Sequence, residues 1–247
     1  MAAACAATLS EMNPFVKVAA LPLERRAVDA AHLQGSFDVL IAGRCPFPEL
    51  VALNTACRAA GVKLFAAAVC QSHGHFFADL GPSHTMYPPP KKVAHDDAGG
   101  DQPGEPAAAA PPKTLVYAPI AAAMAAPLET LPKTLNGAYL LLRAACAVEQ
   151  STGKRLEQGD AAALRRAGAE LRPCPAASAA QALSDASLDA YAAGCGVEMP
   201  AISAVVGGVL ANDVLKAISC VGEPALNFFF FDAASLVGTL DRVACPE

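Results

Sequence analysis

The pattern of apolar and polar positions is most regular near the carboxyl end of the chain, between Pro200 and Ser219. Seven aliphatic side chains there follow the i, i+3, i+4, i+7 spacing of one helical face, namely Ile202, Val205, Val206, Val209, Leu210, Val214 and Ile218. Pro200 suits a first helical turn, and Gly222 and Pro224 end the pattern. The spacing predicts an amphipathic helix over 200–219, and the aromatic run at 227–232 predicts a buried strand after it.

A pair of glycines, Gly207 and Gly208, interrupts the middle of this predicted helix. Each glycine costs a helix interior roughly 1 kcal/mol relative to alanine, so something must compensate. Without a Cβ, another backbone can lie directly on this turn. We therefore predict a close approach here, either a packing crossing within the domain, which is the simpler interpretation, or a contact with another subunit.

The first half of the chain predicts a βαβ unit. Apolar strands are expected at 37–42 and 62–69, on either side of a helix at 48–60. Because these strands are apolar without alternation, both of their faces should be covered, which favours a mainly parallel sheet between helical layers. The segment 73–80 alternates more and fits a strand at an edge or in an antiparallel extension.

Other elements are predicted less sharply. A helix at 2–11 ends at Asn13-Pro14, and its place at the start of the chain suggests that a preceding part is missing. Further expected elements are strands at 15–19, 114–118 and 236–243, a helix at 135–147 and a weakly apolar helical region at 160–193. The segment 88–112 is rich in Pro, Gly, Ala and Asp, and it is predicted to be a disordered insertion in one domain that spans 1–247.

Composition narrows the class of protein. A chain of 247 residues that is 54% hydrophobic can bury a core. A net charge of -5 and a pI near 5.5 argue against nucleic-acid binding. The longest strongly apolar run, 201–211, is shorter than the ~20 residues that cross a bilayer, so we expect no membrane contact. The first residues resemble no secretory or transit signal, which indicates a reducing compartment.

Residues that could carry chemistry are few. Nine cysteines contain no C-x-x-C pair, and we expect most of them to be small buried side chains. Cys195 lies between two glycines and is a candidate exposed thiol, but no histidine near it in sequence could activate it. His73 and His75 flank Gly74 and could ligate a metal, but without an evident third ligand a polar strand face is the better interpretation.

A family resemblance rests on the most regular stretch. The run AVVGGVLANDVLKAIS, followed by NFFFFD, resembles the adenylation domain of ubiquitin-like activating enzymes, in particular the small subunits of SUMO-activating enzymes. Further similarity is carried by NPFVKV, FDVLIAGRC, HGHFFADLG and NGAYLLLRA. The resemblance implies a three-layer Rossmann-like α/β fold of the ThiF/MoeB type, here apparently without its N-terminal part. It also implies a structural or partner-contact role for five residues: Gly207, Gly208, Asp213, Lys216 and Phe229.

The ATP-binding residues of the catalytic members do not align well with this sequence. Their metal-binding Asp falls on Cys45, the following Asn on Pro46 and a phosphate-balancing Arg on Leu50, although Asn54 and Cys57 match. A thiol does not suit Mg²⁺, which prefers oxygen ligands, and leucine cannot balance phosphate charge. The expected glycine-rich turn is also missing, since the only G-x-G is Gly194-Cys195-Gly196. We therefore predict no catalytic, cofactor-binding or metal-binding residue in this chain.

The resemblance implies a non-catalytic subunit of a heterodimer. Its catalytic partner would bind ATP and Mg²⁺, adenylate SUMO and take it onto its own cysteine, with the nucleus as the main location and the cytoplasm as a second one. Small subunits also contribute an N-terminal arginine to the partner's ATP site, and no residue here matches it. Two alternatives remain: a free-standing sulfur-carrier adenylyltransferase of the ThiF/MoeB type, and an inactive truncated product.

Overall fold

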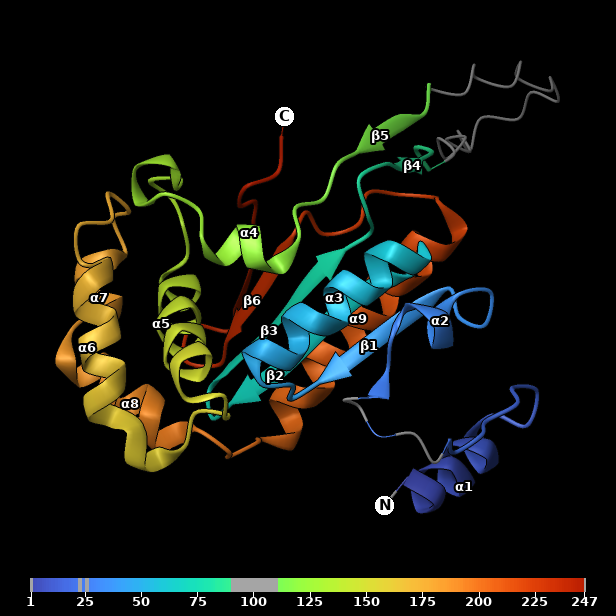
Figure 1. The fold of residues 1–247 in the computed structure, drawn as a ribbon, viewed down its shortest axis with the longest axis horizontal. Helices are drawn as coiled ribbons and strands as arrows, with labels where there is room; N and C mark the ends of the chain where they lie inside the picture. The colour runs from blue at the N-terminus through green and yellow to red at the C-terminus, as the bar shows by residue number, and fades with distance from the viewer. Residues whose placement is uncertain (1, 22–23, 25–26, 90–110, 247) are drawn as a thin grey trace, which may run out of the picture.

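The computed structural model describes residues 2–21, 24, 27–89 and 111–246. Its described part forms three layers, with a mixed β-sheet between helices on both faces (Figure 1). The sheet order is β1-β2-β3-β6-β7. The strands are β1 (Val39–Gly43), β2 (Lys63–Cys70), β3 (His73–Asp79), β6 (Phe228–Asp232) and β7 (Val237–Asp241). The longer helices are α1 (Ala2–Met12), α3 (Phe47–Ala60), α5 (Gly137–Thr152), α6 (Ala161–Leu171), α8 (Asp185–Gly194) and α9 (Pro200–Ser219).

The predicted βαβ unit is confirmed. β1 and β2 pair in parallel, with Val39 opposite Lys63, and α3 connects them. Helix α3 ends at Gly61, whose φ of 72° is the left-handed conformation that glycine adopts most easily. The carboxyl ends of both strands therefore lie at the same edge of the sheet, beside the start of α3.

The expectation of a mainly parallel sheet is wrong for the described residues. β2 pairs with β3, β3 with β6 and β6 with β7, and all three pairings are antiparallel. Only Gln71 and Ser72 connect β2 to β3, and a connection that short can join only antiparallel neighbours. β3 is thus an interior strand of the antiparallel extension rather than an edge.

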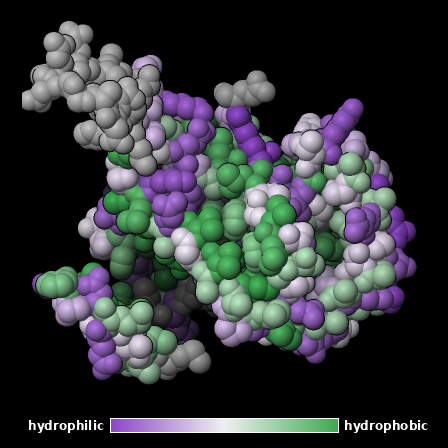
Figure 2. Space-filling model, turned by 180° about the vertical axis from the view of Figure 1, so that it is seen from behind, coloured by the Kyte–Doolittle hydropathy of each residue, from purple (hydrophilic) through white to green (hydrophobic). Residues whose placement is uncertain are grey.

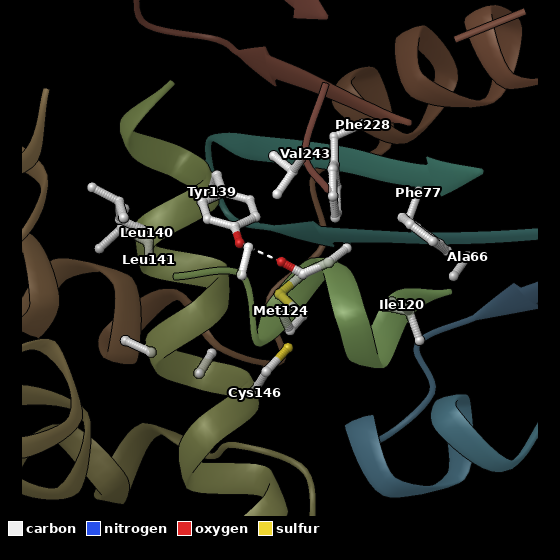
Figure 3. Packing of buried hydrophobic residues seen from close by; sticks show 14 of the residues in the cluster. Ala66, Phe77, Ile120, Met124, Tyr139, Leu140, Leu141, Cys146, Phe228 and Val243 are labelled. Atoms are coloured by element: carbon white, nitrogen blue, oxygen red, sulfur yellow. Dashed lines mark hydrogen bonds between the residues drawn. The ribbon is translucent and has the colours of Figure 1, made fainter. Parts of the chain in front are cut away.

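The aromatic run in β6 contributes to both faces of the sheet, because successive side chains of a strand point in opposite directions. Phe228 and Phe230 belong to the core under α5, whereas Phe229 belongs to the core under α9. On the α5 side, Tyr139 meets Phe228 edge to face at 5.5 Å and donates a 2.6 Å hydrogen bond to the carbonyl of Ala123 (Figure 3). That bond fixes α5 against the short helix α4 (Ile120–Met124).

Among the described helices, only α9 covers the opposite face of the sheet. Ile202, Val206 and Leu210 pack against Phe76 and Phe229, whose rings stack with centroids 5.2 Å apart. In Figure 1, α9 lies behind the sheet, and α3 lies in front of it. The two hydrophobic cores are therefore separated by the sheet.

The structure differs from some of the less regular sequence predictions and confirms others. Residues 15–19 form no strand, and the ring of Phe15 is 97% exposed, because no described strand lies beside this segment. The strand expected at 114–118 is β5 (Lys113–Leu115), which pairs with β4 (His84–Met86) in a separate two-stranded sheet. The region 160–193 is helical as predicted, in α6, the short α7 (Ala179–Ala182) and α8.

The remaining described elements are short. They are helix α2 (Ala30–Leu33) and two 3-10 helices, Leu128–Thr130 and Gln158–Asp160. Helix α1 buries none of its residues. Most of the insertion predicted at 88–112 falls on 90–110, which lies outside the described residues.

Candidate functional site

The carboxyl ends of β1 and β2 are the first place to look for a site, because open α/β sheets commonly bind ligands there. The start of α3 faces this edge with backbone N–H groups that attract anions. A carboxylate of this chain is already bound to it: the N–H of Phe47 donates to Oε2 of Glu149 at 2.8 Å. Oε1 of Glu149 accepts from the N–H of Leu156 at 3.0 Å, and burial raises the pKa of this carboxyl. Glu149 therefore connects α5 to the start of α3.

The family's ATP-site positions serve packing in this chain. The side chain of Leu50 belongs to the core under α5, and Cys57 is fully buried. Asn54 donates to Asp79 at 2.6 Å and accepts from the N–H of Ile120 at 2.9 Å. These contacts fix α3 to the end of β3 and to the start of α4.

Asp79 is the centre of that buried polar network. Arg58 binds it with two hydrogen bonds, of 2.7 Å from Nε and 2.9 Å from a terminal nitrogen, and also donates to the carbonyl of Tyr117. Asp79 is 1% exposed, and a carboxyl group buried in this way is costly without such hydrogen-bond partners. Asn54 and Asp79 are thus committed to holding the fold, and neither faces an open site.

The space at this edge of the sheet is small. The partly open cavity there measures about 90 Å³, below the ~300 Å³ at which ligand pockets usually begin. It is lined by Cys45 just before α3, by Phe47 at the start of α3, by Arg44 and Arg155, and by Glu149, whose carboxylate would face the phosphates. Arg44 at its rim is paired with Glu198 at 2.8 Å. That this chain binds neither ATP nor Mg²⁺ stays a prediction, and the size and lining of this cavity agree with it.

The histidines behave as a polar strand face. His73 lies 3.5 Å from the carboxylate of Asp232, and His75 packs beside the ring of Phe230 with centroids 6.0 Å apart. Burial lowers the pKa of His75 to about 4, so it is neutral at pH 7. Within the described ranges, no cluster of three or more His, Cys, Asp or Glu residues could hold a metal ion.

Helix α9 offers a different kind of site. One face is buried, at Ile202, Val206, Leu210, Asp213 and Ala217. The outer face is exposed but apolar, with Val205 41%, Leu215 65% and Ile218 56% exposed. Figure 2 shows the molecule from the side on which α9 lies, and hydrophobic side chains gather near the middle of this face. Val205 and Ile218, which the sequence pattern assigned to the buried face, thus belong to the outer one.

The glycine pair lies on this outer face. A Cβ added to Gly207 or Gly208 would meet no atom of the described residues within 4 Å, apart from the local helix backbone. The predicted packing crossing within the domain is therefore wrong at this position. The close approach between α9 and the sheet occurs at Gly74 in β3, where an added Cβ would lie 2.5 Å from Val206 and 3.0 Å from Ile202.

The other three predicted residues are structural. Asp213 is 4% exposed, accepts from the N–H of Ala225 at 2.7 Å and pairs with Lys216 at 3.3 Å. Lys216 also donates to the carbonyl of Glu223 at 3.1 Å, so both side chains fix the loop that follows α9. Phe229 is buried beneath α9.

Sequence reasoning missed Glu149 and Gly74. Glu149 is a single acidic residue within the apolar pattern of α5, and such a residue signals a buried hydrogen-bonded carboxylate. Gly74 interrupts a strand pattern, which is a known sign of close packing against a neighbour.

Comparison with known proteins decides the family. A profile of the ThiF family matches residues 2–247. The chain belongs to the ThiF family. Its relatives include SUMO-activating enzyme subunit 1 of Danio rerio, 26% identical over 93% of this chain and 69% of the relative. The Xenopus laevis protein of the same name is 28% identical over 93% of this chain and 70% of the relative. SUMO-activating enzyme subunit 1A of Arabidopsis thaliana is 25% identical over 97% of this chain and 70% of the relative.

The match covers the segments that define the two candidate regions of this ThiF-family chain, the β1–α3 edge and α9. The Rossmann-like α/β fold that the resemblance implied is thereby confirmed, with the mixed sheet described above.

Proposed function

We propose that this chain is a non-catalytic subunit of a SUMO-activating enzyme and binds the catalytic subunit through the outer face of α9. The observation that carries the proposal is that face itself, because an unpaired apolar helix surface is costly in water and marks interaction sites. The relatives named SUMO-activating enzyme subunit 1 supply the identity of the assembly.

The outer face has the shape of a helix-packing surface. Small residues recur along it at a spacing of three or four, at Ala201, Ala204, Gly208 and Ala211, and exposed Leu215 continues the row. Small side chains allow the backbone of a second helix to approach closely, and larger apolar ones beside them are buried by the same contact. The glycine pair, which no contact among the described residues explains, is accounted for by this proposed contact.

A protein partner explains the face better than a bilayer does. Among the described helices, α9 alone is long and apolar enough to cross a membrane, by length and composition only, with 28% of its most apolar window buried. However, its inner face packs on β2 and β3, and Asp213 and Lys216 fasten its last turns to the following loop. Core helices of soluble proteins meet the same length criterion.

The chemistry is assigned to the partner. This is supported by Glu149, which binds the start of α3, and by the cavity beside it, which measures only about 90 Å³. In this proposal the catalytic subunit binds ATP and Mg²⁺, adenylates SUMO and forms the thioester, and this chain contacts SUMO only through the complex. We place the complex in the nucleus and also in the cytoplasm.

The test is complex formation by co-expression with the catalytic SUMO-activating subunit of the same organism. Gly207→Leu puts a branched side chain on the outer face, where this chain has open space. We expect an unchanged melting temperature and at least a tenfold loss of affinity in titration calorimetry, since a misfitting interface side chain typically costs ~1 to 3 kcal/mol. Ala52→Leu, at an exposed position of α3 on the other side of the sheet, is the matched control. Wild-type affinity of Gly207→Leu would refute this interface.

A further inference from the structure

Two cysteines from distant parts of the chain meet at the carboxyl end of β2. Cys70 is the last residue of β2, and Cys195 directly follows α8. Their thiols donate to the same acceptor, the carbonyl of Tyr191, with Sγ to oxygen distances of 3.5 Å for Cys70 and 3.4 Å for Cys195. Both side chains are only partly buried, and both are reduced in this structure.

The backbone around the pair is held in place. The N–H of Gln71 donates to the carbonyl of Val197 at 2.9 Å, which joins the end of β2 to the loop after α8. Gly194 lies so close that an added Cβ would be 2.8 Å from the side chain of Gln71 and 3.4 Å from Sγ of Cys70. The two thiols therefore stay near each other without a rearrangement of the fold.

The surroundings give the two thiols different chemistry. The neighbouring thiol of Cys195 lowers the pKa of the Cys70 thiol, and the charge of Arg155 adds to this effect, while burial opposes it. The neighbouring thiol of Cys70 and burial raise the pKa of Cys195. Cys70 is thus the better nucleophile, and Cys195 is placed to react second.

An oxidant can reach this pair from solvent. A hollow of about 430 Å³ is lined by Arg44, Arg155, Gly159 and Cys195, and it adjoins the inner cavity that Cys70 lines. Cys146 lines that inner cavity too, but it is buried, and burial raises its pKa well above the usual value. Small neutral oxidants such as hydrogen peroxide fit this approach.

We propose that Cys70 and Cys195 form a reversible disulfide when the protein is exposed to hydrogen peroxide. The Cys70 thiolate attacks one peroxide oxygen, the O–O bond breaks, and hydroxide leaves with Cys70 as a sulfenic acid. The Cys195 thiol then attacks that sulfur, so that the S–S bond forms, the S–O bond breaks and water leaves. Two electrons pass from the thiol pair to the peroxide, and a dithiol reductant reverses the reaction.

The bond would act on the segment that leads into α9. Residues 195–199 connect α8 to Pro200, and Gln71 and Val197 already form one backbone contact with the end of β2. A covalent link at Cys195 would fix the start of this segment to the sheet. The disulfide itself does not depend on the proposed function, whereas any effect of it on the outer face of α9 does.

The experiment oxidises the reduced full chain with hydrogen peroxide, blocks the remaining thiols and maps linked peptides by mass spectrometry. We expect two fewer free thiols per chain, a Cys70–Cys195 linked peptide, and recovery of both thiols with dithiothreitol. Cys45→Ser, at another partly buried cysteine that lines the inner cavity, should still form the link. An unchanged thiol count, or a link that joins other cysteines, would overturn the proposal.

A second variant tests the order of attack. Cys195→Ser removes the thiol that reacts second, so Cys70 should stop as a sulfenic acid that dimedone traps. Absence of that adduct would show that Cys70 is not the attacking thiol. If Cys195→Ser fails to fold, the order is decided on the wild-type chain by whether the first dimedone adduct, at short oxidation times, lies on Cys70 or on Cys195.

Discussion

A single glycine in β3 sets the distance between the sheet and α9. At Gly74 the side chains of Val206 and Ile202 occupy the space that a Cβ would need. Both side chains are branched and buried, so neither can move aside easily. Glycine is therefore required at Gly74 by packing, whereas at Gly207 it is not required by anything within the described chain.

Gly74→Ala and Gly207→Ala should have opposite effects on stability. The first forces apart two packed layers, and we expect a loss of ~1 to 3 kcal/mol in the free energy of unfolding. The second adds a methyl group in open space and improves helix propensity, so we expect a gain of ~1 kcal/mol. Urea unfolding of both variants with matched m-values gives the comparison. Equal effects would contradict the packing geometry.

His75 should make stability depend on pH. Burial lowers its pKa to about 4, below the unfolded value of 6.5, so the unfolded chain binds more protons between these two values. The contribution of His75 to the free energy of unfolding is therefore complete above pH 6.5. It decreases as the pH drops towards 4, by at most about 3 kcal/mol.

The measurement compares the unfolding free energies of wild type and His75→Gln across that range. Glu149, whose raised pKa acts in the opposite direction, is present in both proteins and cancels in the difference. The variant should lose less stability on acidification than wild type does. Parallel curves for the two proteins would rule out the lowered pKa of His75 in the folded chain.

At the scale of elements, the sequence predicted regular structure where its own periodicity decides it. Helix α9 was predicted with the bounds that the structure has, because proline and glycine mark its ends. The sheet direction was not predictable in this way, since β2 and β3 are apolar strands whose pairing is set by a two-residue connection. The predicted strand at 15–19 failed because a strand needs a partner, and no described strand pairs with it.

The candidate regions were predictable to different degrees. Family resemblance indicated that Cys45, Pro46 and Leu50 cannot form an ATP site, but it could not show that Glu149 binds the start of α3. That contact joins residues about a hundred positions apart, and local patterns carry no information about such pairs. The periodicity also assigned all seven aliphatic residues of α9 to one buried face. These residues cover more of the helix surface than the sheet can bury, so some of them lie on the outer face.

The loop after α9 gives a prediction at this scale. Asp213→Ala removes the buried acceptor of the N–H of Ala225 and the partner of Lys216. An unsatisfied buried N–H typically costs about 1 to 3 kcal/mol, so we expect the melting temperature to fall by several degrees. Asn212→Ala, at the exposed neighbouring position, should leave it nearly unchanged. If both variants melt alike, Asp213 does not hold the loop.

At the scale of the whole molecule, the two faces of the sheet are covered by different numbers of helices. The face under α3 and α5 is covered further by α6 and α8 at one end of the sheet, whereas the other face carries α9 with its own apolar surface turned outward (Figures 1 and 2). A protein in which helices cover one face of the sheet in two layers, while the single helix on the other face exposes apolar side chains, is suited to bind a partner. The activity of the assembly should therefore be absent from the isolated chain.

That last expectation is tested by pyrophosphate exchange with ATP and SUMO. We expect no exchange above background for this chain alone, because Glu149 binds the start of α3, Leu50 lies in the core and Arg44 is paired with Glu198. Losing one charge-stabilising group typically slows a reaction by about 10² to 10³, and here several are replaced. The catalytic subunit should exchange in complex with this chain, and Gly207→Leu should reduce that rate only at protein concentrations where the complex dissociates. Robust exchange by the isolated chain would instead indicate a free-standing adenylyltransferase. If the exchange rate of the catalytic subunit is the same with and without this chain, the chain is an inactive product.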